Sequence, residues 1–163
     1  VVGRTTDGEG SAVRALRFGT WPEGADFCRI DAGGTRWNVV TPPPSDDAYL
    51  FRMDGPGVLR HAAARLPGFL ADVLADAGAT ADDVDVVVPH QASGVGLRLL
   101  RERLGFPAAR VVDILGDHGN QVSASIPTAL HEAVTSGRLV RGGTALLLGT
   151  GAGLTIGAAL VTY

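Results

Sequence analysis

The fold is decided by one stretch, Val84-Asp85-Val86-Val87-Val88-Pro89-His90-Gln91-Ala92-Ser93-Gly94. A short β-branched apolar run followed by proline, histidine and small residues is typical of a buried strand, a tight loop and a helix start. His90 therefore lies at the carboxyl end of a predicted strand. Ligands of open α/β sheets bind at that end, so we expect His90 near a functional site.

Predicted helices and strands flank this stretch on both sides. Their order predicts an α/β fold with a mixed sheet packed between helices. We interpret Val1-Val2-Gly3 as the end of a strand and residues 21–47, rich in Pro and Gly, as irregular. In the first half of the chain we expect an edge strand over 13–20 and a helix over 57–77, which Pro67-Gly68 kinks or splits. After the opening stretch we expect a helix over 93–104, a strand over 110–114, a loop over 116–121, and a helix that Ser123 or Ser125 caps and that ends at Gly137. Two strands, over 144–148 and 154–163, are joined by a Gly149–Gly153 turn.

Composition excludes several classes of function. The 163 residues are 45% hydrophobic, which is ordinary for one globular domain. The net charge is -3, and the arginines that carry all of the positive charge are dispersed, so we expect no nucleic-acid partner. No apolar run reaches the length of a bilayer span and no signal peptide is visible, which favours a cytoplasmic protein without a membrane partner. A single cysteine and no Cys or His pair at ligand spacing predict no disulfide and no metal.

Three groups that can donate hydrogen bonds are expected to lie close together. His90 follows one strand, Asn120 follows the next, and the Gly149–Gly153 turn ends a third. A right-handed crossover brings the first two loops to the same sheet edge. Alone, His90 is readily a structural histidine and Asn120 a turn residue beside Gly119. Together, these donors suit a carbonyl oxygen that becomes negative, as in acyl or enolate chemistry.

Three motifs in order carry a resemblance to a known family. They are Val88-Pro89-His90-Gln91-Ala92, then His118-Gly119-Asn120 with Ser123-Ala124-Ser125-Ile126-Pro127, then Gly149-Thr150-Gly151-Ala152-Gly153-Leu154 with Ala158-Ala159-Leu160-Val161. The chain resembles the C-terminal half of β-ketoacyl-acyl carrier protein synthase III, a thiolase-like condensing enzyme. The resemblance covers residues 51–163, and Arg52-Met53-Asp54-Gly55 matches the entry to the first helix of that half. It implies a condensing-enzyme domain over 51–163, preceded over 1–50 by the tail of an N-terminal half and a connecting segment.

The resemblance also implies a reaction and its site. The family condenses an acyl thioester with a malonyl thioester, with loss of carbon dioxide, in fatty acid or polyketide-like metabolism. Its substrates are acyl-CoA and acyl carrier protein thioesters, it needs no cofactor, it forms homodimers, and its nucleophilic cysteine lies in the N-terminal half. By the resemblance, His90 and Asn120 are catalytic and the Ala152 N–H completes an oxyanion hole. The pantetheine arm would pass Gly55, Ala92, Gly151 and Gly153.

Four positions depart from the best-known members: Pro56 and Ser93 replace asparagines, Val95 a basic residue and Thr150 an aromatic. These changes leave the carrier, the primer and the reaction open. One alternative is acyl transfer to oxygen or nitrogen with His90 as general base. Another is a non-catalytic partner subunit that shapes the pocket of a second protein. We expect the chain in isolation to associate, because it would expose the apolar face that packs on its sister half.

The remaining reactive side chains receive plainer interpretations. We expect His118 to brace its loop, and His61 and His131 to be structural or surface residues of helices. Cys28 lies in the irregular region without a following helix, so we interpret it as an ordinary thiol. The Gly149–Gly153 turn lacks dinucleotide-binding spacing and leads into a strand, which disfavours a phosphate cradle.

Overall fold

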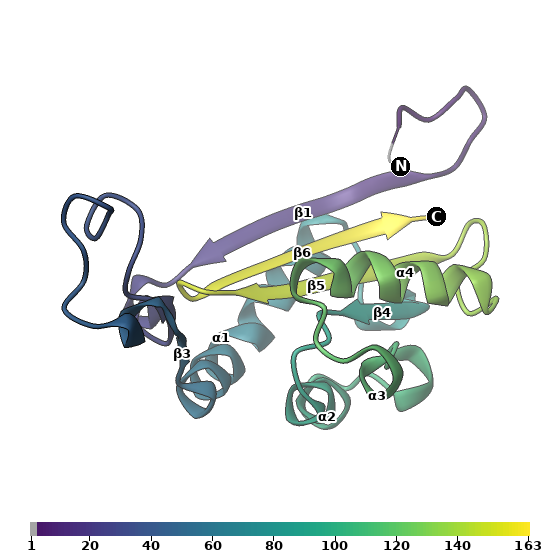
Figure 1. The fold of residues 1–163 in the computed structure, drawn as a ribbon. Helices are drawn as coiled ribbons and strands as arrows, with labels where there is room; N and C mark the ends of the chain where they lie inside the picture. The colour runs from purple at the N-terminus through teal and green to yellow at the C-terminus, as the bar shows by residue number, and fades with distance from the viewer. Residues whose placement is uncertain (1–2) are drawn as a thin grey trace.

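A mixed four-stranded sheet forms the centre of the protein, seen in a computed structural model that describes residues 3–163. Val1 and Val2 of the expected strand end lie outside these residues, and Gly3 belongs to no strand. The strands are β1 (Ala12–Thr20), β4 (Val86–Pro89), β5 (Thr144–Gly151) and β6 (Thr155–Thr162), in the order β1-β6-β5-β4. Only β4 and β5 pair in parallel, and β1 is an edge strand as predicted (Figure 1). The predicted α/β class with a mixed sheet is confirmed.

One face of the sheet is covered by α1 (Gly55–Asp76) and α2 (Gly94–Arg103). Helix α1 runs unbroken through Pro67, so it is not split there. Its buried side chains continue across that point from Leu66 to Phe69, Leu70 and Val73. We attribute the intact helix to this burial, because tertiary packing outweighs the one hydrogen bond that a proline removes.

The opposite face is only partly covered. Helix α4 (Ser125–Thr135) packs on β4 and β5 through Ala129 and Ala133, which are fully buried. No helix of the described chain covers β1 and β6 on this side, where Leu16 and Phe18 are 61% and 70% exposed. The described part of the chain therefore leaves an apolar strip of its sheet open. The β1–β6 pairing also joins the segment before residue 51 to this sheet, and the predicted domain boundary stays a prediction.

The predicted strand over 110–114 is wrong. Only Val111 forms an isolated bridge, to Val87, and the chain then enters a short helix, α3 (Leu115–His118), where a loop was expected. Pro89 has no N–H with which to continue the ladder, so the pairing stops after one bridge.

Two smaller predictions also need correction. Neither Ser123 nor Ser125 caps α4, which begins at Ser125 after the 3-10 turn Val122–Ala124 and has no side-chain cap. Most of the predicted Gly149–Gly153 turn is strand, since β5 pairs with β6 out to Gly151 and Thr155.

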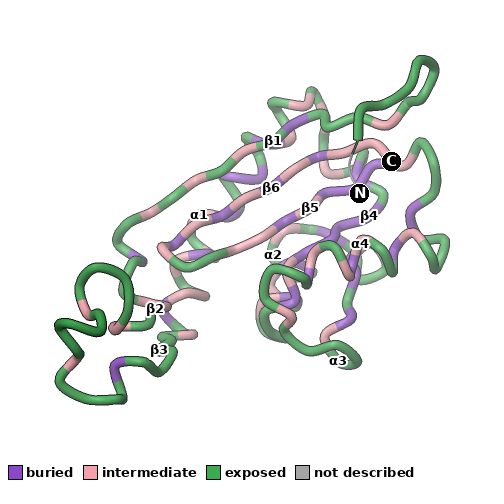
Figure 2. Tube along the Cα trace, turned by 45° about the horizontal axis from the view of Figure 1, so that its top comes forward, coloured by how far each residue is buried: buried purple, intermediate pink, exposed green. Residues whose placement is uncertain are grey.

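A small two-stranded ribbon lies beside the main sheet. It pairs β2 (Cys28–Ile30) with β3 (Phe51–Met53), and the segment between them is mostly exposed (Figure 2). Short 3-10 helices also form at Pro22–Gly24, Asp46–Tyr49, Ala81–Asp83 and Ala108–Arg110. No helix within residues 3–163 has both the length and the apolar character needed to cross a bilayer.

Candidate active site

His90 is held at the carboxyl end of β4. Its backbone N–H donates to the Leu148 carbonyl at 2.7 Å, which ties the loop to the end of the neighbouring β5. The side chain is half-buried, and this burial lowers the pKa of the imidazole. Within residues 3–163 the ring makes no hydrogen bond. A neutral ring with no protein partner can donate one N–H to a substrate oxygen or accept a proton from a substrate.

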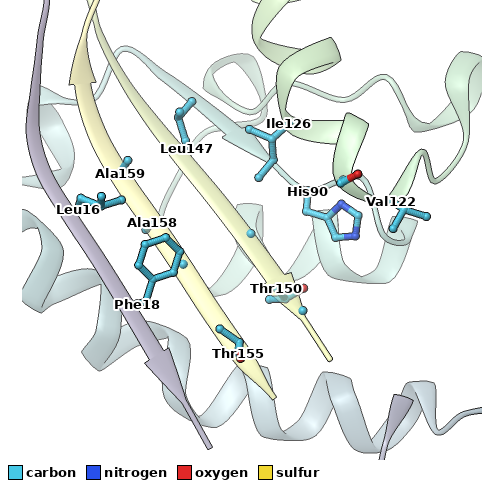
Figure 3. A pocket seen from close by; sticks show the side chains of 14 residues that line it. Leu16, Phe18, His90, Val122, Ile126, Leu147, Thr150, Thr155, Ala158 and Ala159 are labelled. Atoms are coloured by element: carbon cyan, nitrogen blue, oxygen red, sulfur yellow. The ribbon is translucent and has the colours of Figure 1, made fainter. Parts of the chain in front are cut away.

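A first cavity, of about 480 Å³, opens on the partly covered face of the sheet. We call it the open-face cavity. Its floor is formed by β5 and β6, with Leu16 and Phe18 of β1 on one side and Ile126 of α4 on the other (Figure 3). His90 and the exposed Val122 lie at the α4 side of this space. The cavity is thus mostly apolar, with the His90 ring on its α4 side.

A second cavity, of about 420 Å³, lies between the first turns of α1 and the start of α2. We call it the α1–α2 cavity. Its lining includes Gly55 and Ala92, which the resemblance places along a pantetheine arm, and the apolar side chains of Val58, Ala62 and Leu99. The structure brings these two predicted residues together, while their role in binding stays a prediction.

Only two of the described residues, His90 and Thr150, line both cavities. They lie at the ends of the parallel strands β4 and β5. The two cavities therefore meet at the histidine, and a small hydroxyl-bearing side chain stands beside the junction. The sequence signalled Thr150 only as a departure from the family pattern, so its position between two cavities was not predicted.

Asn120 lines neither cavity. Its side chain is exposed, and its Oδ1 accepts a hydrogen bond from the Val122 N–H at 2.9 Å. Val122 has φ 54°, the one positive φ of a non-glycine residue in the described chain. The local turn that the sequence suggested for Asn120 is present, and the next residues, Val122 and Ser123, do line the open-face cavity.

Only part of the β5–β6 hairpin end lines a cavity together with His90. Gly151 lines the open-face cavity, whereas Ala152 and Gly153 at the tip line neither cavity. The oxyanion role of the Ala152 N–H and the pantetheine contacts of Gly151 and Gly153 stay predictions.

Cys28 and the other histidines line neither cavity. Cys28 begins β2, and burial, together with the nearby Asp54 carboxylate, raises the pKa of its thiol. A raised pKa disfavours the thiolate that a nucleophile needs. His61 packs against the Phe27 ring with centroids 4.6 Å apart, and His118 and His131 are exposed on α3 and α4.

Comparisons with known proteins show which family the chain belongs to. Residues 74–163 match the family described as 3-oxoacyl-[acyl-carrier-protein] synthase III C terminal. β-Ketoacyl-[acyl-carrier-protein] synthase III of Rhizorhabdus wittichii is 45% identical over 161 residues, covering 96% of this chain and 50% of the relative. The Sphingopyxis alaskensis protein of the same description is 44% identical over 159 residues, covering 95% and 50%.

Solved structures give the same result. The synthase III of Thermus thermophilus superposes with a TM-score of 0.84 at 33% identity, covering 99% of this chain and 49% of that one. The synthase III of Aquifex aeolicus gives 0.81 at 30%, covering 98% and 47%. The chain spans about half the length of these relatives.

The observed fold and the matches to known proteins together show the class of this protein, which is the C-terminal half of a thiolase-like condensing enzyme. The chain belongs to the 3-oxoacyl-[acyl-carrier-protein] synthase III C-terminal family.

Proposed function

We propose that this chain is the malonyl-activating half of a β-ketoacyl-acyl carrier protein synthase III-type enzyme. The whole enzyme condenses an acyl thioester with a malonyl thioester and releases carbon dioxide. One observation carries the proposal: His90, which burial favours in the neutral form and whose ring has no hydrogen-bond partner among the described residues, lies where two cavities meet. A condensation needs such a junction, because the acyl group and the malonyl group must reach the same reacting atoms.

In the proposed reaction, the C–C bond to the malonyl carboxylate breaks and its electron pair forms an enolate. The negative charge develops on the thioester oxygen, to which the His90 N–H donates. The enolate carbon then attacks the acyl group on a cysteine, the new C–C bond forms, and the thiolate leaves. A preorganised donor of this kind contributes about 10²–10³ in rate.

Asn120 is suited to supply a second donor to that oxygen. The bond from the Val122 N–H uses Oδ1 and fixes the amide plane, and it leaves both hydrogens of Nδ2 without a partner among the described residues. Because the amide is oriented before substrate binds, little reorganisation is required in the reaction. The exposed position of Asn120 also requires another surface to close the site around it.

The two cavities then divide the substrates. The apolar α1–α2 cavity suits the pantetheine arm of CoA or of a carrier protein, with Gly55 and Ala92 in its wall. The open strip with Leu16 and Phe18 suits the N-terminal half of the enzyme, which would bring the nucleophilic cysteine to the open-face cavity. A homodimer of the two-half protein is part of this proposal.

A second candidate is acyl transfer to oxygen or nitrogen. The lowered pKa of His90 favours it, because a general base must be unprotonated at the working pH. In that reaction the ring would take a proton from the attacking hydroxyl or amine, and no carbon dioxide would form.

The experiment that separates these functions uses the full gene product that contains residues 1–163. Intact mass is measured after incubation with acyl-CoA, and released label is measured after adding malonyl thioester labelled in its free carboxyl group. An acyl adduct followed by labelled carbon dioxide is the expected result. An adduct without carbon dioxide would favour acyl transfer to another acceptor. The absence of both would leave a non-catalytic partner subunit and contradict the proposal.

A further inference from the structure

Gln91, the residue after His90, is a fully buried polar side chain that the reaction described above does not use. Its Nε2 donates to the carbonyls of Pro89 at 2.9 Å and Val112 at 3.1 Å. Its Oε1 accepts from the Ile114 N–H at 3.0 Å. One side-chain amide therefore satisfies three backbone groups on two separate segments. A buried amide with all of these bonds made is rigid, because losing any one leaves a buried polar group unpaired.

These bonds replace a piece of β-ladder. The Val112 N–H donates to the Val87 carbonyl at 2.9 Å, as in a parallel pair. The next two ladder bonds would run from the amide of residue 89 to the Val112 carbonyl and from the Ile114 amide to the Pro89 carbonyl. Pro89 has no N–H, so the first bond cannot form. The Gln91 amide fills the gap, since it donates to both orphaned carbonyls and accepts from the Ile114 N–H.

From Ile114 the connection continues toward Asn120. Ile114 precedes α3, and its carbonyl accepts from the His118 N–H at 2.9 Å. The Leu115 carbonyl accepts from the Gly119 N–H, also at 2.9 Å. Asn120 follows directly. A short series of hydrogen bonds thus links the residue after His90 to the residue before Asn120.

We propose that Gln91 is a positioning residue that holds the His90 loop and the Asn120 loop in one fixed geometry. The inference rests on the proposed condensation, in which both side chains donate to the same enolate oxygen. It assigns Gln91 to the decarboxylation step alone. The attack of the cysteine on acyl-CoA uses neither His90 nor Asn120 in the proposed reaction, so it should not depend on Gln91.

The test measures the two steps separately in the full gene product carrying Gln91→Leu, a change close to the same size. Decarboxylation of malonyl thioester is expected to fall about 10–100-fold, since small misplacements of catalytic groups cost up to about 10²-fold. Acylation by acyl-CoA, followed by intact mass, is expected to change by less than about twofold per folded molecule.

Val73→Ala is the matched control. Val73 is fully buried in α1 and lines neither cavity. The Val73→Ala substitution lowers the stability of the protein, so it should lower acylation and decarboxylation by the same factor, in proportion to the fraction of folded molecules. If Gln91→Leu behaves in the same way, or leaves decarboxylation unchanged, Gln91 has only a structural role and the inference is overturned. Wild-type protein that releases no carbon dioxide would instead refute the proposed function, and this inference with it.

Gln91→Glu keeps the inference testable if the leucine variant does not fold. The introduced carboxyl group can donate to a carbonyl only when protonated, and burial raises its pKa. Decarboxylation by this variant is expected to decline, relative to wild type, as the pH rises, while acylation follows the wild-type profile. Parallel pH profiles for both steps would contradict the proposal.

Discussion

Gly57→Ala is a substitution for which general rules and this structure disagree. Gly57 lies in the first turn of α1, where its N–H donates to the Asp54 Oδ1 at 2.9 Å. Alanine is a better helix former than glycine by up to about 1 kcal/mol, which predicts stabilisation. A Cβ on Gly57, however, would lie 2.2 Å from the Asp54 Oδ2 and 3.1 Å from the Phe27 ring.

The two effects are of similar size. The Asp54 carboxyl group must rotate away, and losing an aspartate cap costs about 1 kcal/mol. Displacement of Phe27 adds to this cost. We therefore expect Gly57→Ala to destabilise the protein by about 0–1 kcal/mol. In an Asp54→Ala background the carboxylate is already gone, so the same change should stabilise by up to about 1 kcal/mol.

The assay is a double-mutant cycle of urea unfolding on the full gene product, with wild type, both single variants and the double variant. The expected coupling energy is about 1 kcal/mol. Equal stabilisation by Gly57→Ala in both backgrounds would mean that the Asp54 cap and the new Cβ do not compete, which contradicts this prediction. The same turn lines the α1–α2 cavity through Gly55 and Pro56, so loss of the cap should also raise KM for a CoA substrate.

Three further predictions concern the cavities and the histidine. Thr150 lines both cavities, so Thr150→Phe should narrow the junction and lower condensation with long acyl-CoA more than with short acyl-CoA, whereas Thr150→Val, of similar size, should leave that ratio unchanged. Steady-state kinetics with both substrates would measure the ratio, and the same ratio in the two variants would contradict the prediction. If the N-terminal half covers β1, Phe18→Ser should destabilise the full gene product by about 2 kcal/mol or more, measured by urea unfolding. A change within about 0.5 kcal/mol would mean that Phe18 stays exposed in the full gene product. Burial lowers the pKa of His90 in the folded protein, so as the pH falls the unfolded chain takes up this proton first, and the free energy of unfolding should decrease below about pH 6.5. Urea-unfolding midpoints measured against pH should lose this part of their pH dependence in His90→Gln. The same pH dependence in His90→Gln and wild type would contradict the prediction.

The sequence was sufficient to predict the elements with the strongest local patterns. The β-branched run before Pro89 is a strand with every residue buried, and His90 follows it. Ser93 is the N-cap of α2, where its side chain accepts a hydrogen bond from the Gly96 N–H, and Gly137 has the positive φ expected just past the end of α4. In each case the local pattern and the final packing require the same conformation.

Predictions failed where one segment's conformation depends on another. Residues 110–114 are apolar enough for a strand, but their pairing partner contains Pro89, and the Gln91 side chain takes the place of the ladder. Nothing in the spacing of Gln91 reveals that it is fully buried. The hairpin continues to Gly151 because Thr155 and Ile156 pair with Gly151 and Thr150, which moves Ala152 to the exposed tip.

We propose that His90 stabilises the enolate formed from malonyl thioester and takes no part in loading the acyl group. The most direct measurement compares His90→Ala with wild type in the full gene product, following acyl adduct formation by intact mass and carbon dioxide release from labelled malonyl thioester. We expect an acyl adduct at the wild-type level and a loss of decarboxylation of about 10²–10³. Unchanged carbon dioxide release, or loss of the acyl adduct with decarboxylation retained, would contradict it.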